Sequence, residues 1–456
     1  MEFIKGSQFS YKSMNSSTQD LESKVGSNGT LPDIQKPIVY PIRWFILILF
    51  VFFSASNSMQ WIQYAIISPV ITSYYGVSND WVNWTSLIFM VLYIPFIFPG
   101  SYLLEKLGMR LAITIGIFGT CLGAWIKVAS VDPSRFYIGF IGQSSVALSQ
   151  VFVLSVPARL AAIWFGPDQV SSACSIGVFG NQIGIAAGFV IPPMIVQVGP
   201  VEQVTRQLYI LFIGVAILTS ILLILILCFF KSAPPTPPSY AAQQQGEEEE
   251  VGFITSLKNL FKNRSFMFLL IAYGINVGVF YAISTLLNDI VTNFYKGADK
   301  DAGRIGLVIT VAGMVGSVCC GYVLDKFRKY KETTIVVYAF SLLGMVVFTF
   351  TIDQGLWVVY LVAGLLGFFM TGLLPVGFEL GSELTYPEPE GTQAGLLNAG
   401  SQVFGIAFTN LYSPLFRNAS PMWANISMCV ALAVGLFMVS SVSSHLKRQA
   451  ALTAKK

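Results

Sequence analysis

The sequence has few charged residues for its length. Only 11% of its 456 residues are Asp, Glu, Lys or Arg, whereas 54% are hydrophobic. Soluble globular chains carry about 25% charged residues. So few charges cannot cover the water-facing surface of a soluble protein of this size. The composition therefore excludes an ordinary soluble enzyme and indicates a chain solvated mostly by lipid.

Other absences narrow the chemistry. The chain has one histidine, His445, and its six cysteines include no CxxC pair, so we expect no disulfide framework. No GxxxxGK[ST] motif is present, which argues against an ATP-driven pump. No cluster of Lys and Arg accompanies a nucleic-acid-binding motif. We therefore expect no enzymatic activity, no cofactor or metal, and no nucleic-acid partner.

What the chain does have is a series of long apolar runs. The hydrocarbon core of a bilayer needs about 20 helical residues to cross it, and lipid excludes open sheets. We therefore predict an all-α membrane protein whose partner is the lipid bilayer. Its twelve transmembrane helices are expected over 44–67, 82–103, 110–130, 135–160, 172–197, 207–230, 265–288, 303–323, 334–352, 356–381, 392–414 and 422–444.

Polar segments divide these runs into two groups of six. We predict a disordered cytosolic tail over 1–42, a six-helix bundle over 43–230, a cytosolic linker over 231–263, a second bundle over 264–444 and a C-terminal tail over 445–456. With the tails and the linker on one side, that side holds most of the 27 Lys and Arg residues. The positive-inside rule then places both termini in the cytosol.

The end of the linker carries its own pattern. Phe253, Leu257, Leu260 and Phe261 recur at helical spacing, with lysines between them. This pattern predicts a short amphipathic helix on the membrane surface. The plainer alternative is that these residues simply begin the seventh transmembrane helix.

Two loops repeat an acidic-basic pair at matched places. The loop after the second run contains Glu105, Lys106 and Arg110, and the loop after the eighth contains Asp325 and Lys326. The two acids differ by 220 in residue number, and we call this difference the repeat offset. Both loops resemble the signature loop of the major facilitator superfamily. The resemblance implies two pseudo-symmetric six-helix bundles, with these residues in a cytoplasmic gate that opens as the bundles rock. Plain positive-inside charge is the alternative.

Three further charged residues extend this predicted gate. The repeat offset places Arg159 opposite Glu379, and Glu383 follows one helical turn later. Both acids fall toward the cytosolic end of the tenth run. We therefore predict that they pair with basic residues when the cytoplasmic side closes.

The same offset relates two aromatic residues inside the runs. Trp61 lies in the first run, and Tyr281 lies at the equivalent depth of the seventh. Aromatic faces attract quaternary ammonium groups, so the pair predicts a cation site between the bundles. Ordinary packing, or a place in the aromatic belt at the membrane surface, is the alternative for either residue.

Uncharged amides also lie within the apolar runs. Polar side chains are costly in lipid, which makes each a candidate for binding; helix–helix hydrogen bonds are the alternative. No acid or histidine lies near the middle of any run, which favours a facilitative carrier over an ion-coupled one. The amides are Gln150, Asn181, Gln182 and Gln402.

Six strings in order along the chain resemble the feline leukemia virus subgroup C receptor family, solute carrier family forty-nine of the major facilitator superfamily. The strings are 59–68, 122–127, 163–167, 180–184, 280–288 and 395–398. The resemblance implies a monomeric carrier of choline and ethanolamine. It also implies that Trp61 and Tyr281 clamp the substrate, that Gln150 and Gln402 line the cavity, and that Asn181, Gln182 and Met90 lie near it.

Two alternatives to a plasma-membrane choline uniporter remain at this point. The family has also been described as heme exporters, but His445 lies outside the helices, and heme iron needs an axial His, Cys, Met or Tyr ligand. A non-transporting receptor or scaffold is the other alternative, although the loops expected outside are short.

Overall fold

The computed structural model describes residues 38–154, 156–166, 169–236, 238, 253–327, 329–386, 388 and 390–443. Over these residues the chain forms helices joined by short loops and contains no strand. Eleven of the described helices are long and apolar enough to cross a membrane. The predicted all-α membrane class is confirmed.

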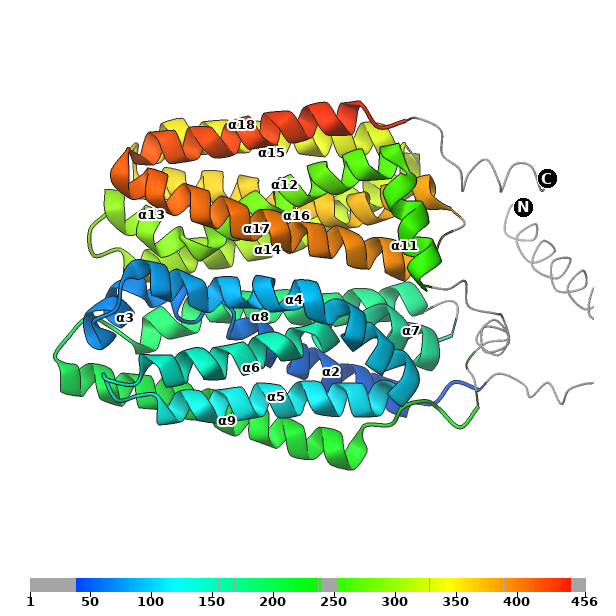
Figure 1. Cartoon of the computed structure of the whole chain (residues 1–456), viewed down its shortest axis with the longest axis horizontal. Helices are drawn as coiled ribbons and strands as arrows, with labels where there is room; N and C mark the ends of the chain where they lie inside the picture. The colour runs from blue at the N-terminus through cyan, green and yellow to red at the C-terminus, as the bar shows by residue number, and fades with distance from the viewer. Residues whose placement is uncertain are drawn as a thin grey trace, which may run out of the picture.

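Figure 1 shows two layers of helices, one from each half of the chain. The N-terminal half contains α2 (Ile42–Met59), the 3-10 helix η1 (Ala65–Ile67), α3 (Ser68–Tyr75), α4 (Asn79–Leu107), α5 (Met109–Ala129), α6 (Phe136–Leu154), α7 (Pro157–Trp164), α8 (Val170–Ile195) and α9 (Val201–Phe229). The C-terminal half contains α11 (Phe253–Lys262), α12 (Arg264–Thr285), α13 (Leu287–Phe294), α14 (Asp299–Phe327), α15 (Tyr330–Thr351), α16 (Leu356–Thr385), α17 (Glu390–Asn418) and α18 (Pro421–Ser440).

The twelfth predicted span, 392–414, lies inside α17. This helix is 29 residues long, which is enough to cross a bilayer. It is not one of the eleven helices that are apolar enough to cross a membrane, because amides and other polar residues interrupt its apolar run. Two of these amides, Gln393 and Gln402, are buried in the protein, so lipid does not have to solvate them.

The helix bounds follow the repeat offset that the charged loops suggested. Helices α4 and α14 match it at both ends, and the starts of α6 and α16, of α8 and α17, and of α9 and α18 match it as well. The chain is thus built from two similar bundles. The domain limits drawn from the sequence stay predictions, and residues 1–37, 239–252 and 444–456 lie outside the described residues.

The first predicted span is not one continuous helix, and that expectation was wrong. Helix α2 ends at Met59, and the chain turns through 60–64 and η1 before α3 begins at Ser68. Pro69, in the first turn of α3, lacks the N–H that an unbroken helix would need there. The break places Trp61 in a non-helical segment. The equivalent break in the other half is a single residue, Leu286, between α12 and α13.

A separate helix is present where the amphipathic pattern predicted one. Helix α11 is followed by Asn263, whose side chain caps α12 by accepting a hydrogen bond from the backbone N–H of Phe266 at 3.2 Å. Leu260 is buried, whereas Phe261 is exposed. A place for this helix on the membrane surface stays a prediction.

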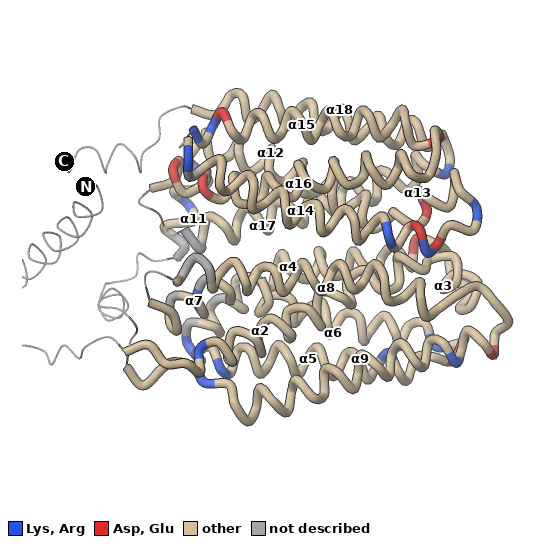
Figure 2. Tube along the Cα trace, turned by 180° about the vertical axis from the view of Figure 1, so that it is seen from behind, with Lys and Arg blue, Asp and Glu red and all other residues tan. Residues whose placement is uncertain are grey.

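The two ends of the bundle are easily told apart. We call the end where α7 and α11 lie the tail end, because α2 begins there and α18 ends there (Figure 1). We call the opposite end, where α3 and α13 lie, the far end. Charged residues gather at these two ends (Figure 2), as the cost of burying charge in lipid requires.

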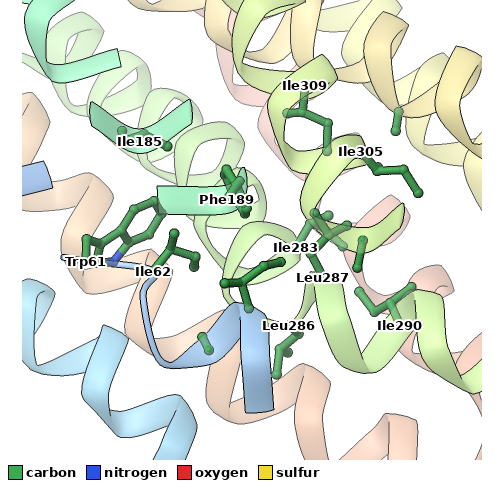
Figure 3. Packing of buried hydrophobic residues seen from close by; sticks show 14 of the residues in the cluster. Trp61, Ile62, Ile185, Phe189, Ile283, Leu286, Leu287, Ile290, Ile305 and Ile309 are labelled. Carbon is green, nitrogen blue, oxygen red and sulfur yellow. The ribbon is translucent and has the colours of Figure 1, made fainter. Parts of the chain in front are cut away.

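The hydrophobic core differs between the two ends. One buried cluster joins both halves and includes Trp61, Ile62 and Phe189 from one with Leu286 and Ile305 from the other (Figure 3). Two further clusters each lie within one half. The residues of one cluster fall within 46–230, and those of the other fall within 260–442. The halves are therefore packed together toward the far end and keep separate cores toward the tail end.

Candidate substrate site

The break after α2 presents Trp61 to the opposite half. Its side chain is only 4% exposed, and the centroid of its ring lies 5.6 Å from that of Tyr281, with the two planes at 72°. This is an edge-to-face contact, which aromatic pairs favour. The two residues that the repeat offset paired in the sequence therefore meet in the structure.

Two more predicted residues lie beside Tyr281. Gln402 on α17 is 3% exposed, and its side-chain amide lies next to the hydroxyl of Tyr281. Met90 on α4 is buried and reaches α17 at Gly405, where an added Cβ would lie 2.8 Å from its Sδ and 3.1 Å from Cδ2 of Tyr281. Glycine at position 405 is what allows α17 to approach both side chains.

The other predicted amides sit on the N-terminal half alone. Gln150 on α6 and Asn181 and Gln182 on α8 are half-buried. Oε1 of Gln150 and Nδ2 of Asn181 are buried and have no hydrogen-bond partner among the described residues. The backbone carbonyl of Asn181 accepts a hydrogen bond from Ser58 at 2.9 Å. The described contacts do not join these three side chains to the aromatic pair.

The predicted gate residues lie toward the tail end. Lys106 lies 5.9 Å from the ring centroid of Tyr102, and Lys326 lies 5.9 Å from that of Tyr322. Arg110 donates to the backbone carbonyl of Leu227 at 2.9 Å.

The acids of this gate are described only in part. The side chains of Glu105 and Asp325 lie outside the described residues. Of the others, Glu383 is buried, Arg159 is half-buried and Glu379 is exposed. The gate itself therefore stays a prediction.

Sequence reasoning missed a group of polar links at the far end. Arg417 pairs with Asp80, and Asn79 donates to Asp289, so both contacts join the two halves. They border a cavity of about 370 Å³ that Lys296 also lines. Burial raises the pKa of Asp289 to about 6, although the hydrogen bond from Asn79 and the charge of Arg417 act to lower it. These links join the ends of helices from different halves, and no repeat or periodicity in the sequence pairs their positions.

A second missed feature is a buried lysine within α5, the helix of the third predicted span. Lys127 is 1% exposed, and its Nζ lies 2.9 Å from Oε1 of Gln63 and 3.0 Å from Oε1 of Gln143. A lysine inside an apolar run was the available signal. No group of His, Cys, Asp and Glu among the described residues could hold a metal ion.

The arrangement suits a small organic cation. Trp61 and Tyr281 supply aromatic faces, which attract cations when water is excluded. Gln402 and Met90 add an amide and a polarisable sulfur. These groups come from both halves, so relative movement of the halves would assemble the site or take it apart.

Comparison with protein families agrees with the architecture. The family model described as Major Facilitator Superfamily matches residues 45–409. The transporter FucP in its outward conformation is similar in structure, with a TM-score of 0.64 at 13% identity over 89% of this chain and 99% of that one. An inward-facing bacterial homologue of the lysosomal transporter Spinster has a TM-score of 0.62 at 13% identity, over 89% of this chain and 95% of that one.

Sequence relatives are much nearer. An uncharacterised transporter of this superfamily from Caenorhabditis elegans is 50% identical over 419 residues, which are 91% of this chain and 72% of the relative. The choline/ethanolamine transporter flvcr2a of Danio rerio is 46% identical over 91% of this chain and 89% of its own. The choline/ethanolamine transporter FLVCR2 of Homo sapiens is 45% identical over 90% of this chain and 78% of its own. The chain therefore belongs to the feline leukemia virus subgroup C receptor family of the major facilitator superfamily, and is a multi-pass membrane transporter of small molecules rather than an enzyme.

Proposed function

We propose that this chain is a facilitative carrier of choline, and of ethanolamine, that works by alternating access. The observation that carries the proposal is the edge-to-face contact of Trp61 and Tyr281, which come from opposite halves. A quaternary ammonium group on an aromatic face gains about 2 kcal/mol or more once water is excluded. The names of the relatives in Danio rerio and Homo sapiens support the same substrates.

The carrier is proposed to work by rocking its halves around this contact. In the state described, the hydrophobic cluster joins the halves toward the far end, while each half keeps its own core toward the tail end. Choline would bind as Trp61 and Tyr281 part to admit it. Exchange of far-end contacts for tail-end contacts would then turn the site toward the other side of the membrane.

Passive transport follows from where the acids lie. In the described membrane helices, Asp and Glu stand in the end regions, as Asp299 and Glu332 do at the starts of α14 and α15. An ion-coupled carrier usually needs a carboxylate or histidine in the bilayer. Choline itself carries one charge, so its flux should follow the membrane potential by about 2.3 kcal/mol per 100 mV.

We propose that the protein is a monomer in the plasma membrane and that its tail end faces the cytosol. The predominance of Lys and Arg in the segments assigned to that side supports the orientation. One copy of the chain supplies both halves of the site, so a second copy is not needed for transport.

Radiolabelled choline uptake in cells expressing the chain tests the proposal, with heme efflux measured in parallel. Uptake should fall when potassium depolarises the cells and persist when sodium is replaced. Abolition of uptake by a protonophore at clamped voltage would contradict the uniporter. Heme efflux without choline uptake would support the alternative cargo instead.

A further inference from the structure

The segment between α2 and α3 leaves backbone groups without helical partners inside the bundle. In lipid-embedded protein such groups must find other partners. Side chains supply them here: Gln143 donates to the backbone carbonyl of Gln60 at 2.7 Å, and Ser86 donates to that of Trp61 at 3.2 Å. Asn288 of the other half donates to the carbonyl of Ile66 at 2.8 Å. The break is therefore held by specific hydrogen bonds on both sides of Trp61.

Lys127 ties this set of contacts together. Its Nζ donates to Oε1 of Gln143 and to Oε1 of Gln63. Gln143 is the residue that donates to the carbonyl of Gln60, so Lys127 fixes both this amide and the side chain of Gln63. It also lies 5.8 Å from the ring centroid of Tyr64. A lysine ammonium has three N–H donors, and the hydrogen bonds to Gln143 and Gln63 use two of them.

The position of Lys127 on its helix suits a buried positive charge. It lies in the last turn of α5, where the helix dipole is negative and favours a cation. A lysine buried among amides is still costly. This cost points to a role that an apolar side chain would not supply.

The C-terminal half has neither a lysine nor amides at the positions equivalent to Lys127, Gln143 and Gln63. The repeat offset carries Lys127, Gln143 and Gln63 onto three apolar residues, Val347, Ala363 and Ile283. There the break is the single residue Leu286, and few backbone groups need other partners. The apolar counterparts indicate that neither the fold nor the helix pairing demands a lysine at this place.

We propose that Lys127 is a positioning residue for transport: it holds residues 60–67 in their interrupted conformation and thereby aims Trp61 at the substrate site. No hydrogen bond or ring contact joins Lys127 to Trp61 among the described residues, and it acts through Gln143 and Gln63. The substrate-affinity part of this proposal rests on the proposed choline function, whereas the backbone part does not.

Hydrogen–deuterium exchange tests the backbone part without any substrate. In Lys127→Met, amide exchange in 60–67 should rise at least about tenfold, because local opening becomes easier. Exchange around Leu286 should stay as in the parent protein. Val347→Met, at the mirror position, and Lys300→Met, an exposed lysine on α14, are the matched controls. Where Lys127→Met does not fold, Lys127→Gln replaces it. Unchanged exchange in 60–67 would overturn the proposal.

A double-mutant cycle on choline binding tests the action through Trp61. Lys127→Met alone should weaken binding about tenfold, and in a Trp61→Phe background it should cost at most about twofold, because coupled residues are not additive. If the loss of choline affinity in the double variant equals the product of the two single-variant losses, Lys127 does not act through Trp61. If the parent protein binds no choline but 60–67 still loosens in Lys127→Met, the proposed function fails while the assigned role in holding the segment stands.

Discussion

The far end and the tail end of this transporter are built from the same repeated helices but are packed differently. Toward the far end, buried residues of both halves form one cluster, and polar pairs such as Asp80 with Arg417 join α4 to α17. Toward the tail end, each half has a core of its own. A scaffold made of two similar halves can form either interface, and the state described has formed the one at the far end.

The difference identifies where movement has to occur. Within each half, the buried clusters would move as rigid units because packed interiors deform little. The contacts between the halves are the ones that must break and re-form. Trp61 and Tyr281 lie where the joined region gives way to the separated one, which is where a substrate can be gripped in one state and released in another.

The largest effect is expected from removing the aromatic side chains of Trp61 or Tyr281 at this boundary. Trp61→Ala should lower choline uptake by about 30-fold, which corresponds to a cation–π contribution of about 2 kcal/mol. Tyr281→Ala should be severe and Tyr281→Phe mild, because the phenyl face is retained. Uptake normalised to surface expression is the measurement. Equal losses for the Phe and Ala variants would mean that the hydroxyl, which lies next to Gln402, matters more than the ring.

A smaller loss is expected from wedging the far end open. A Cβ at Gly303 on α14 would lie 2.3 Å from the backbone oxygen of Phe189 on α8, whereas a Cβ at Gly321 on the same helix, toward the tail end, would meet nothing within 4 Å. Overpacking costs about 1–3 kcal/mol, so Gly303→Ala should reduce uptake about tenfold.

The control for this wedge is Gly321→Ala, which should behave as the parent protein. A cysteine placed at Ser86, which is buried at the far end, should become more reactive toward an impermeant thiol reagent in Gly303→Ala. Equal reactivity in both alanine variants would remove the basis for calling the far end the closed one.

A modest pH dependence is expected from Asp289. Its pKa is about 6 in the closed far end against an ordinary value of 3.8, so the closed state holds a proton more tightly than a hydrated, open one. Closure is thus favoured as pH falls through 6, and this advantage is lost as pH rises above it. Between external pH 7.5 and 5.5, labelling at position 86 should fall a few-fold further than the decline that the smaller thiolate fraction of the cysteine itself causes.

Asp289→Asn should remove this additional pH dependence and leave only the decline that comes from the cysteine thiol. The charged groups that face Asp289 are Asp80 and Arg417, with Lys296 along the same cavity. The same fall in labelling in Asp289→Asn as in the parent protein would assign the additional titration to another group.

The smallest effect is expected from the ion pair of Asp80 with Arg417. Both side chains are partly exposed to solvent, and exposed pairs contribute about 0.2–1 kcal/mol. Asp80→Asn should therefore open the far end only slightly, and less so at high salt. The charge-swapped double variant, with Arg at 80 and Asp at 417, should restore labelling at position 86 to the parent level. Failure of the swap would show that the two residues act separately.

The sequence predicted the architecture well for physical reasons. Lipid permits few solutions for a chain of long apolar runs, and the duplicated loops revealed the repeat. The same repeat paired Trp61 with Tyr281, which the structure brings within 5.6 Å. Met90 and Gln402 could be placed near them by family resemblance alone.

The rest depends on local departures from the helical pattern. An apolar run such as 44–67 does not reveal where its helix breaks, because the residues that support the break, Gln143 and Lys127, lie far away in sequence. The far-end links likewise join residues such as Asn79 and Asp289, 210 positions apart. Side-chain pairing across such distances follows from the packing of the halves, which no periodicity encodes.

Equilibrium exchange of radiolabelled choline in liposomes containing the purified protein tests the central claim most directly: a cation is carried passively between two halves that grip it through Trp61 and Tyr281. With no sodium, proton or voltage gradient, label outside should exchange with unlabelled choline inside. Trp61→Ala should slow this exchange about 30-fold, as expected from the loss of about 2 kcal/mol, and the exposed-lysine control Lys300→Met should leave its rate unchanged. Absence of exchange in the parent protein, or exchange at the parent rate in Trp61→Ala, would contradict the account.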